Sequence, residues 1–181
     1  MFSLWRDGID DGALLAPFHV THVDAHADLG LGDSGYTYLL TELLHQPVDQ
    51  RRYPKLDGSG LGDGNYLAFA VACRWISDLV YTYNEGGGSD LLAYLMDGFD
   101  PNADHIRMPV LTHQELKRVM GWQNPTVEHF EPCVPVRTVP WRNFTADAPF
   151  DAIFLARSPA FTPPESDTIF DAIRATFIDE A

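Results

Sequence analysis

The chain has 181 residues, a length typical of one ordinary domain, and we expect a single domain over 1–181. Its composition, with 45% hydrophobic and 21% charged residues, favours a packed core and excludes a disordered chain. The formal net charge of −14 repels phosphate backbones and anionic lipid headgroups, so we expect no nucleic acid and no membrane as partner. A cationic small molecule or peptide would be attracted by the same field, although such a surface can also serve only solubility.

Targeting signals and cysteine chemistry are not evident. No apolar run is long enough to span a bilayer, and Met1–Asp11 lacks the basic start and apolar middle of a signal peptide, so we expect a cytoplasmic protein. Cys73 lies in an apolar stretch and Cys133 lies between prolines, each without a second Cys nearby. We expect buried or incidental thiols rather than a metal knuckle or redox pair.

The first elements alternate between strand and helix. Pro17–Asp24 is rich in β-branched residues and alternates, which predicts a strand, and Ala25–Gly35 follows as a Gly-rich loop. Tyr36–His45 has apolar residues at helical spacing, which predicts a helix. Gln46–Gly62, rich in Pro, Gly, Asp and Arg, is typical of a long loop.

The middle of the chain continues this alternation. Asn65–Ile76 is apolar on nearly every side, which predicts a buried helix, and Asp78–Tyr83 follows as a short strand. Asp90–Met96 is predicted as a short helix, His105–Thr112 as a strand and Gln114–Met120 as a helix.

The last third adds strands and a closing helix. Val127–Phe130 and Val136–Val139 are predicted as short strands, and the apolar run Asp151–Ala156 as a buried strand. Glu165–Ile178 is predicted as an amphipathic helix, because Ile169, Ile173 and Phe177 form an apolar stripe at helical spacing.

Alternating strands and helices predict an α/β fold, in which helices cover both faces of a mostly parallel sheet in three layers. In such sheets ligands bind beyond the carboxyl ends of the strands. This rule places the candidate site at Asp24–Asp33 and at Arg157–Glu165.

Three residues just past the first strand have the chemistry of a metal site. In an extended chain, positions i, i+2 and i+4 project to one side, so Asp24, His26 and Asp28 can converge on one point. Two carboxylates and one imidazole suit a divalent ion such as Mn²⁺, which activates water for hydrolysis. The alternative is a pair of solvated loop acids beside a histidine.

The same stretch, Thr21–Gly30 (THVDAHADLG), resembles the Asp-Ala-His-x-Asp signature of arginases and other ureohydrolases. More of the chain is similar to an arginase-like family that includes the peptide arginases, which convert arginine side chains of precursor peptides to ornithine and urea with two Mn²⁺ ions. The remaining similar segments are Ser3–Gly12 (SLWRDGIDDG), Gly62–Ile76 (GDGNYLAFAVACRWI), Glu131–Trp141 (EPCVPVRTVPW) and Phe150–Glu165 (FDAIFLARSPAFTPPE).

The resemblance implies a fold, a metal centre and a reaction. The fold would be the three-layer αβα sandwich of arginases and deacetylases. Asp24 would bridge two metals, His26 would bind one and Asp28 the other, with one or two Mn²⁺ ions or another divalent metal bound. The enzyme would hydrolyse a guanidinium C–N bond of a small molecule or peptide, with Asp24 and His26 at the catalytic centre.

Two features depart from the family pattern. Ureohydrolases have a further metal-binding His at the end of an upstream strand, and the family members that this chain resembles have a His-containing motif a few residues before the position matching Trp5. Because this chain begins at Met1, we expect that N-terminal ligand segment to be missing. The second Asp-x-Asp pair is also absent, since Leu95 stands where its first Asp belongs. Asp97 and Asp100 are better explained as residues that close a helix.

Further polar residues have two interpretations each. Asn65 is a candidate catalytic residue or a cap of the following helix. His22 would extend the ligand row along the strand or be a hydrogen-bonded core residue. Arg157 and Ser158 belong to the site or to a turn before Pro159.

An acid in the second candidate region would orient the substrate. Glu131 or Glu165 could pair with a guanidinium through a bidentate contact, and Glu165 is equally explained as a first-turn residue that the helix dipole favours.

Two other functions remain open. A deacetylase-like amidohydrolase needs only one metal, for which an Asp, His and Asp set suffices. A catalytically inert binding protein would keep the fold without full metal ligation.

Overall fold

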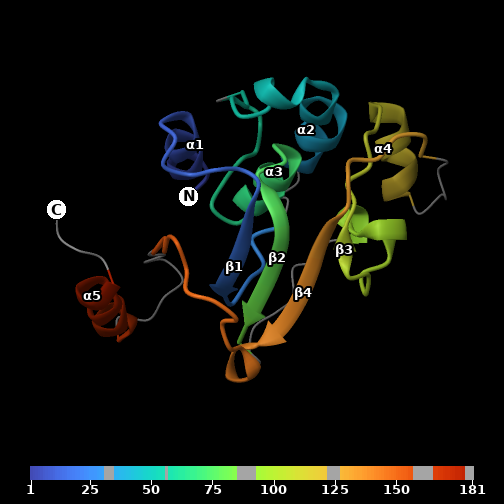
Figure 1. The fold of residues 1–181 in the computed structure, drawn as a ribbon. Helices are drawn as coiled ribbons and strands as arrows, with labels where there is room; N and C mark the ends of the chain where they lie inside the picture. Colours follow the sequence, from blue (N-terminus) through green and yellow to red (C-terminus); the bar gives the residue numbers. More distant parts are fainter. Residues whose placement is uncertain (31–34, 56, 85–92, 122–126, 157–164, 178–181) are drawn as a thin grey trace. The chain divides into compact units, whose positions relative to one another are not determined.

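Figure 1 shows the structure, a computed structural model that describes residues 1–30, 35–55, 57–84, 93–121, 127–156 and 165–177. The chain divides into two compact units, Phe2–Phe144 and Thr145–Ala181 together with Met1. Among the described residues, no helix has both the length and the apolar composition that a bilayer crossing needs.

A four-stranded mixed sheet organises the larger unit. Its strands are β1 (Phe18–Asp24), β2 (Ile76–Tyr83), β4 (Val134–Pro140) and the short β3 (His105–Ile106), in the order β1-β2-β4-β3. Strands β1, β2 and β4 are parallel and end at the same edge (Figure 1), whereas β3 is antiparallel to β4. The predicted α/β class and three of the predicted strands, those matching β1, β2 and β4, are confirmed.

One face of this sheet carries the core. Val20 lies opposite Leu79 and His22 opposite Tyr81 in the register of β1 and β2, and all four side chains are buried. Every residue of helix α3 (Tyr66–Ala72) is also buried, as its apolar sequence predicts. The alternate residue Val23 points to the other face and is 66% exposed.

The predicted helix Asn65–Ile76 is shorter in the structure. Its chain leaves the helix after Ala72, and Arg74 takes a positive φ of 58°, a left-handed conformation that ends a helix. The Trp75 amide then donates to the Ala70 carbonyl, and Ile76 begins β2. The other α-helices of the described residues are α1 (Phe2–Asp10), α2 (Gly35–Thr41), α4 (His113–Met120) and α5 (Ser166–Phe177).

Several predicted helices are confirmed with changed bounds. The Tyr36–His45 segment forms α2 and a 3₁₀ turn, and Gln114–Met120 lies within α4. Of Asp90–Met96, the described part forms a 3₁₀ turn at Ala93–Leu95. Further 3₁₀ turns are Leu43–His45, Val48–Gln50, Asp97–Phe99, which Asp100 follows as its C-cap, and Trp141–Asn143.

Helix α1 joins the core through aromatic rings. Phe2 stacks on Trp75 with ring centroids 4.7 Å apart. Trp5 packs edge-on against Phe18 of β1 at 5.4 Å and against Tyr66 of α3 at 5.6 Å. Buried aromatic pairs of this kind add about 0.5–1.5 kcal/mol beyond the area that they bury.

Three predicted strands are wrong in whole or in part. Asp151–Ala156 forms no strand, and its Ile153 and Phe154 are exposed, because an apolar run becomes a strand only where a neighbouring strand completes its hydrogen bonds. His105–Thr112 is a strand only at His105–Ile106. Val127–Phe130 contributes a single bridge, from Phe130 to Pro109.

The smaller unit contains helix α5, which confirms the helix predicted at Glu165–Ile178. Its apolar stripe includes Ile169, which is 63% exposed, and Ile173, which is half-buried.

Candidate metal centre

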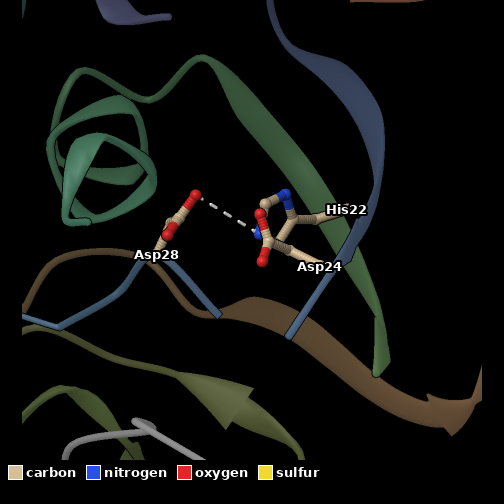
Figure 2. A group of neighbouring side chains, drawn as sticks. All are labelled: His22, Asp24 and Asp28. Carbon is tan, nitrogen blue, oxygen red and sulfur yellow. Dashed lines mark ion pairs between the residues drawn. The ribbon is translucent and has the colours of Figure 1, made fainter. Parts of the chain in front are cut away.

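Three side chains with metal-binding atoms converge at the end of β1. His22, Asp24 and Asp28 each offer a ligand atom, and these atoms all lie within 4.8 Å of one another (Figure 2). The Nε2 atom of His22 lies 3.5 Å from Oδ2 of Asp28. His22 is buried, Asp28 is half-buried and Asp24 is exposed. Among the described residues, no other cluster of three His, Cys, Asp or Glu side chains meets this criterion.

Local backbone geometry explains the cluster. His22 and Asp24 are alternate residues of β1 and so share one face of the strand. The chain bends directly after Asp24, whose Oδ1 accepts a hydrogen bond from the His26 amide at 3.3 Å. Asp28 then adopts a positive φ of 49°, which Asp tolerates better than most residues, and its carboxylate returns toward His22.

The loop that carries Asp28 is anchored to helix α3. The Asp28 carbonyl accepts a hydrogen bond of 3.3 Å from the amide of Leu67. One ligand pair therefore belongs to the sheet, and the third ligand is held by the first turn of the core helix.

Aromatic residues surround the His22 imidazole. Tyr81 of β2 stacks on the ring, with centroids 6.0 Å apart and planes at 26°. The Tyr66 hydroxyl lies 3.4 Å from Nδ1, and the Tyr66 ring stands edge-on to the imidazole. The Tyr81 hydroxyl donates to the Ala25 carbonyl at 3.0 Å. One tyrosine ring thus stacks on the imidazole, and the hydroxyl of the other lies beside its Nδ1 atom.

Burial and the two carboxylates of the cluster set the state of Tyr66. Burial raises the pKa of the Tyr66 phenol, and the negative charges of Asp28 and Asp24 raise it further, because both effects disfavour phenolate. The hydroxyl therefore keeps its proton and can both donate and accept a hydrogen bond.

The donor set fits a divalent cation. Ligands about 2.0–2.3 Å from one ion lie roughly 3–4 Å from each other, and the three ligand atoms here lie within 4.8 Å of one another, which is close to that spacing. Two carboxylates and one imidazole match Mn²⁺ or a related ion in charge and ligand type. Residues His22, Asp24 and Asp28 are thus chemically able to hold such an ion.

His26 lies outside this group. Its side chain is exposed, and only its backbone takes part in the centre: the amide binds Asp24, and the carbonyl lies 3.0 Å from Nε2 of His22. The sequence pattern assumed an extended chain from Asp24 to Asp28, whereas the bend after Asp24 breaks that alternation. The structure therefore brings Asp24 and Asp28 together with His22 rather than with His26.

The structure gives the Asn65 side chain a contact that the sequence did not predict. Asn65 occupies the N-cap position of α3 without a side-chain cap. Its side chain instead holds the preceding loop, accepting from the Gly62 amide at 2.8 Å and donating to the Gly60 carbonyl at 2.7 Å. Gly35 packs so closely on this amide that an added Cβ would lie 3.0 Å from its nitrogen.

Glu131 pairs with guanidinium groups of the chain itself. Its carboxylate accepts from Arg51 at 3.0 Å and from Arg74 at 2.9 Å, and both Glu131 and Arg51 are buried. Arg51 also donates to three backbone carbonyls, those of Leu44, Gln46 and Ala72. Glu131, which the sequence offered as a bidentate partner of a substrate, instead pairs with Arg51 and Arg74 of the chain itself. We call this ion-paired group of three side chains the clamp.

The second candidate region is described only at its end. Arg157 and Ser158 lie outside the described residues. Glu165 is exposed in the turn before α5, in the smaller unit.

The sequence indicated part of this centre. His22 was recognisable because it lies two residues before Asp24 in β1, so that both side chains project from the same face of the strand. Tyr66 and Tyr81 were not recognisable as neighbours of the imidazole, because their approach depends on how α3 and β2 pack.

Comparisons with known proteins add no relative. No protein-family model matches the chain, and no match is found among curated proteins or solved structures.

Proposed function

We propose that the chain is a divalent-metal-dependent hydrolase of the ureohydrolase type, which cleaves a guanidinium C–N bond. The single observation that supports this proposal is the convergence of His22, Asp24 and Asp28 on one point at the carboxyl end of β1. Ligand sites of parallel α/β sheets lie at this edge. The resemblance of Thr21–Gly30 to the ureohydrolase signature supports the reaction class, and the proposal includes the three-layer arginase-like sandwich as the fold.

Each residue of the centre has a proposed task. His22, which is buried, and Asp28, which is half-buried, would hold the ion from the core side of the site. Asp24, which is exposed, would face the substrate side and complete the ligand set. When bound, a Mn²⁺ ion supplies a water of lowered pKa and a Lewis acid next to the carbon under attack.

The proposed substrate is a guanidinium on a small molecule or a peptide, such as an arginine side chain that yields ornithine and urea. A net charge of −14 attracts such a cation over long range. Arg157, Ser158 and Glu165 remain proposed substrate-orienting residues on the basis of the family resemblance alone.

The test measures metal binding and turnover separately. Purified protein is titrated with Mn²⁺ by calorimetry, and urea release is measured from free arginine and from an arginine-containing peptide. Asp24→Asn and Asp28→Asn should lose both binding and turnover, whereas the exposed Asp49→Asn should keep them. Absence of Mn²⁺ binding by the unmodified chain, or binding without urea release from either substrate, would contradict the proposal.

A second candidate is a deacetylase-like amidohydrolase with one metal. Three protein ligands around one point are the number that single-metal hydrolytic sites use, with water in the remaining position. A stoichiometry of one ion per chain with acetyl-lysine hydrolysis and no urea release would favour this reaction class.

A further inference from the structure

We infer that a cleft at the C-terminal end of α3 binds a small aliphatic carboxylate, whose tail lies on the apolar wall and whose head pairs with Arg74. The cleft has a volume of about 350 Å³ and lies wholly in the larger unit. Its apolar wall consists of Ile9, Leu14, Leu15, Ala16, Val48 and Trp75. The loop of the candidate metal centre is anchored to the first turn of α3, whereas the cleft lies beyond its last turn. The inference therefore does not rest on the proposed function.

The clamp gives this end of α3 a surplus positive charge. It contains two guanidinium groups, those of Arg51 and Arg74, but a single carboxylate, that of Glu131. Arg51 is 4% exposed and directs its nitrogens to Glu131 and to backbone carbonyls, which carry no net charge. The side chain of Arg74 is 48% exposed. The surplus charge of the clamp therefore reaches solvent at Arg74.

Arg74 presents this charge to the cleft. It lines the cleft, and its hydrogen bond to Glu131, at 2.9 Å, uses Nε, one of its three nitrogens. A guanidinium binds a carboxylate best through two parallel hydrogen bonds. Arg52 also lines the cleft but is already paired with Asp10 at 2.7 Å, and none of the described lining residues is acidic. An anion in the cleft would therefore pair with Arg74.

The backbone of Arg74 supplies a well-matched variant. Its φ of 58° is left-handed, a conformation that costs free energy for arginine and that glycine adopts without strain. Arg74→Gly thus removes the guanidinium and relieves the backbone together. The buried Glu131 carboxylate keeps its partner Arg51 in this variant, with the hydrogen bond at 3.0 Å. We therefore expect Arg74→Gly to fold.

The apolar wall selects an anion with a tail. Leu15 is 83% exposed and stands between two other wall residues, Leu14 and Ala16. Covering this surface with an aliphatic chain removes apolar area from water, which stabilises the complex. Each methylene added between butanoate and octanoate should therefore raise the affinity by about two- to fourfold.

The first experiment uses the unmodified chain and does not depend on how well a variant folds. ¹⁵N-labelled protein is titrated with hexanoate, and the amide shifts in ¹H–¹⁵N spectra should concentrate at residues 14–16 and 73–75. Hexanamide has the same tail without the charge and should bind at least about tenfold more weakly, because hydrogen bonds to charged groups are the stronger ones. Shifts spread over the surface, no saturation, or equal affinity for hexanamide would overturn the inference.

The second experiment compares three proteins: the unmodified chain, Arg74→Gly and Arg118→Gln. Arg118 is exposed in α4 and does not line the cleft, so its variant loses the same charge elsewhere. Arg74→Gly should weaken hexanoate binding by about tenfold or more and leave hexanamide binding unchanged. Arg118→Gln should bind both compounds like the unmodified chain. Full hexanoate affinity in Arg74→Gly, or an equal loss in Arg118→Gln, would overturn the inference, and neither result bears on Mn²⁺ binding.

Discussion

The Nε2 atom of His22 lies 3.5 Å from the Asp28 carboxylate, so a residue inside strand β1 meets one on the loop beyond it. This contact joins the two supports of the candidate centre, the sheet and the first turn of α3. The imidazole of His26, which stands between Asp24 and Asp28 in the sequence pattern, is exposed instead. Substitution of the two histidines should therefore have different effects on metal affinity.

His22→Ala should weaken Mn²⁺ binding by at least about tenfold, because it removes one of three protein ligands. His26→Ala should leave the affinity nearly unchanged, because that side chain lies outside the cluster and its backbone contacts persist. Calorimetric titration of both variants checks the prediction, with circular dichroism confirming that each retains its helix content. The reverse ranking would assign the ligand to His26, as the ureohydrolase resemblance implies.

The strands and helices with strong periodicity were predictable from the sequence. Alternation in Pro17–Asp24 and helical spacing in Gln114–Met120 both specify local structure that tertiary packing keeps. Asp151–Ala156 was not predictable in the same way. Its apolar run has no local signal that distinguishes a buried strand from an exposed segment, because a strand needs a partner from elsewhere in the chain.

The candidate centre was predictable only in part for a related reason. Side-chain parity holds while a chain remains extended, and it therefore relates His22 to Asp24 correctly. The bend after Asp24 and the positive φ of Asp28 are set by contacts with α3, which spacing alone does not reveal. The rule that alternate residues share a face was applied beyond this bend, where it no longer holds, and it therefore predicted His26 as a ligand.

Glu131→Gln should destabilise the fold by about 3 kcal/mol, because Arg51 would retain a buried charge without its carboxylate partner. Arg51 also connects Glu131 to the end of α3 through the Ala72 carbonyl, so the loss should reduce global rather than local stability. Urea unfolding measures the difference. Glu128→Gln, at an exposed position nearby, is the matched control and should unfold like the unmodified chain. Equal stability of the two variants would contradict the clamp.

The same clamp predicts a pH dependence. Burial opposes ionisation of Glu131, but hydrogen bonds from Arg51 and Arg74 outweigh it and hold the pKa of Glu131 below its ordinary value. A lowered pKa in the folded state stabilises the protein above the ordinary carboxyl pKa of about 4.3, and this stabilisation is lost as pH falls through the folded-state pKa. Urea unfolding between pH 7 and pH 3.5 should show a steeper acid loss in the unmodified chain than in Glu131→Gln. If the unfolding free energies of the two proteins fell in parallel with pH, the acid loss would not come from Glu131.

The two thiols should differ in reactivity. Cys73 is buried, and burial raises the pKa of its thiol to about 12, so almost no thiolate is available at pH 8. Cys133 is exposed. A disulfide reagent such as DTNB should label one thiol per native chain and two in urea, and Cys133→Ser should abolish the native reaction. Rapid labelling of both thiols in the native protein would contradict the burial of the α3 end.

Thr112→Ala should cost about 1 kcal/mol of stability, since Thr112 and Glu115 form a reciprocal cap at the start of α4. The Glu115 amide donates to the Thr112 hydroxyl at 3.2 Å, and the Thr112 amide donates to the Glu115 carboxylate at 2.7 Å. This backbone hydrogen bond, together with one from the Thr112 hydroxyl, lowers the pKa of Glu115. Thr112→Ser keeps a hydroxyl at the cap and should retain most of the stability. Thr112→Val keeps the shape of the side chain without its hydroxyl and should lose as much stability as Thr112→Ala. Urea unfolding of the three variants therefore separates the hydrogen bond from side-chain volume, and equal stability of serine and valine would contradict the cap.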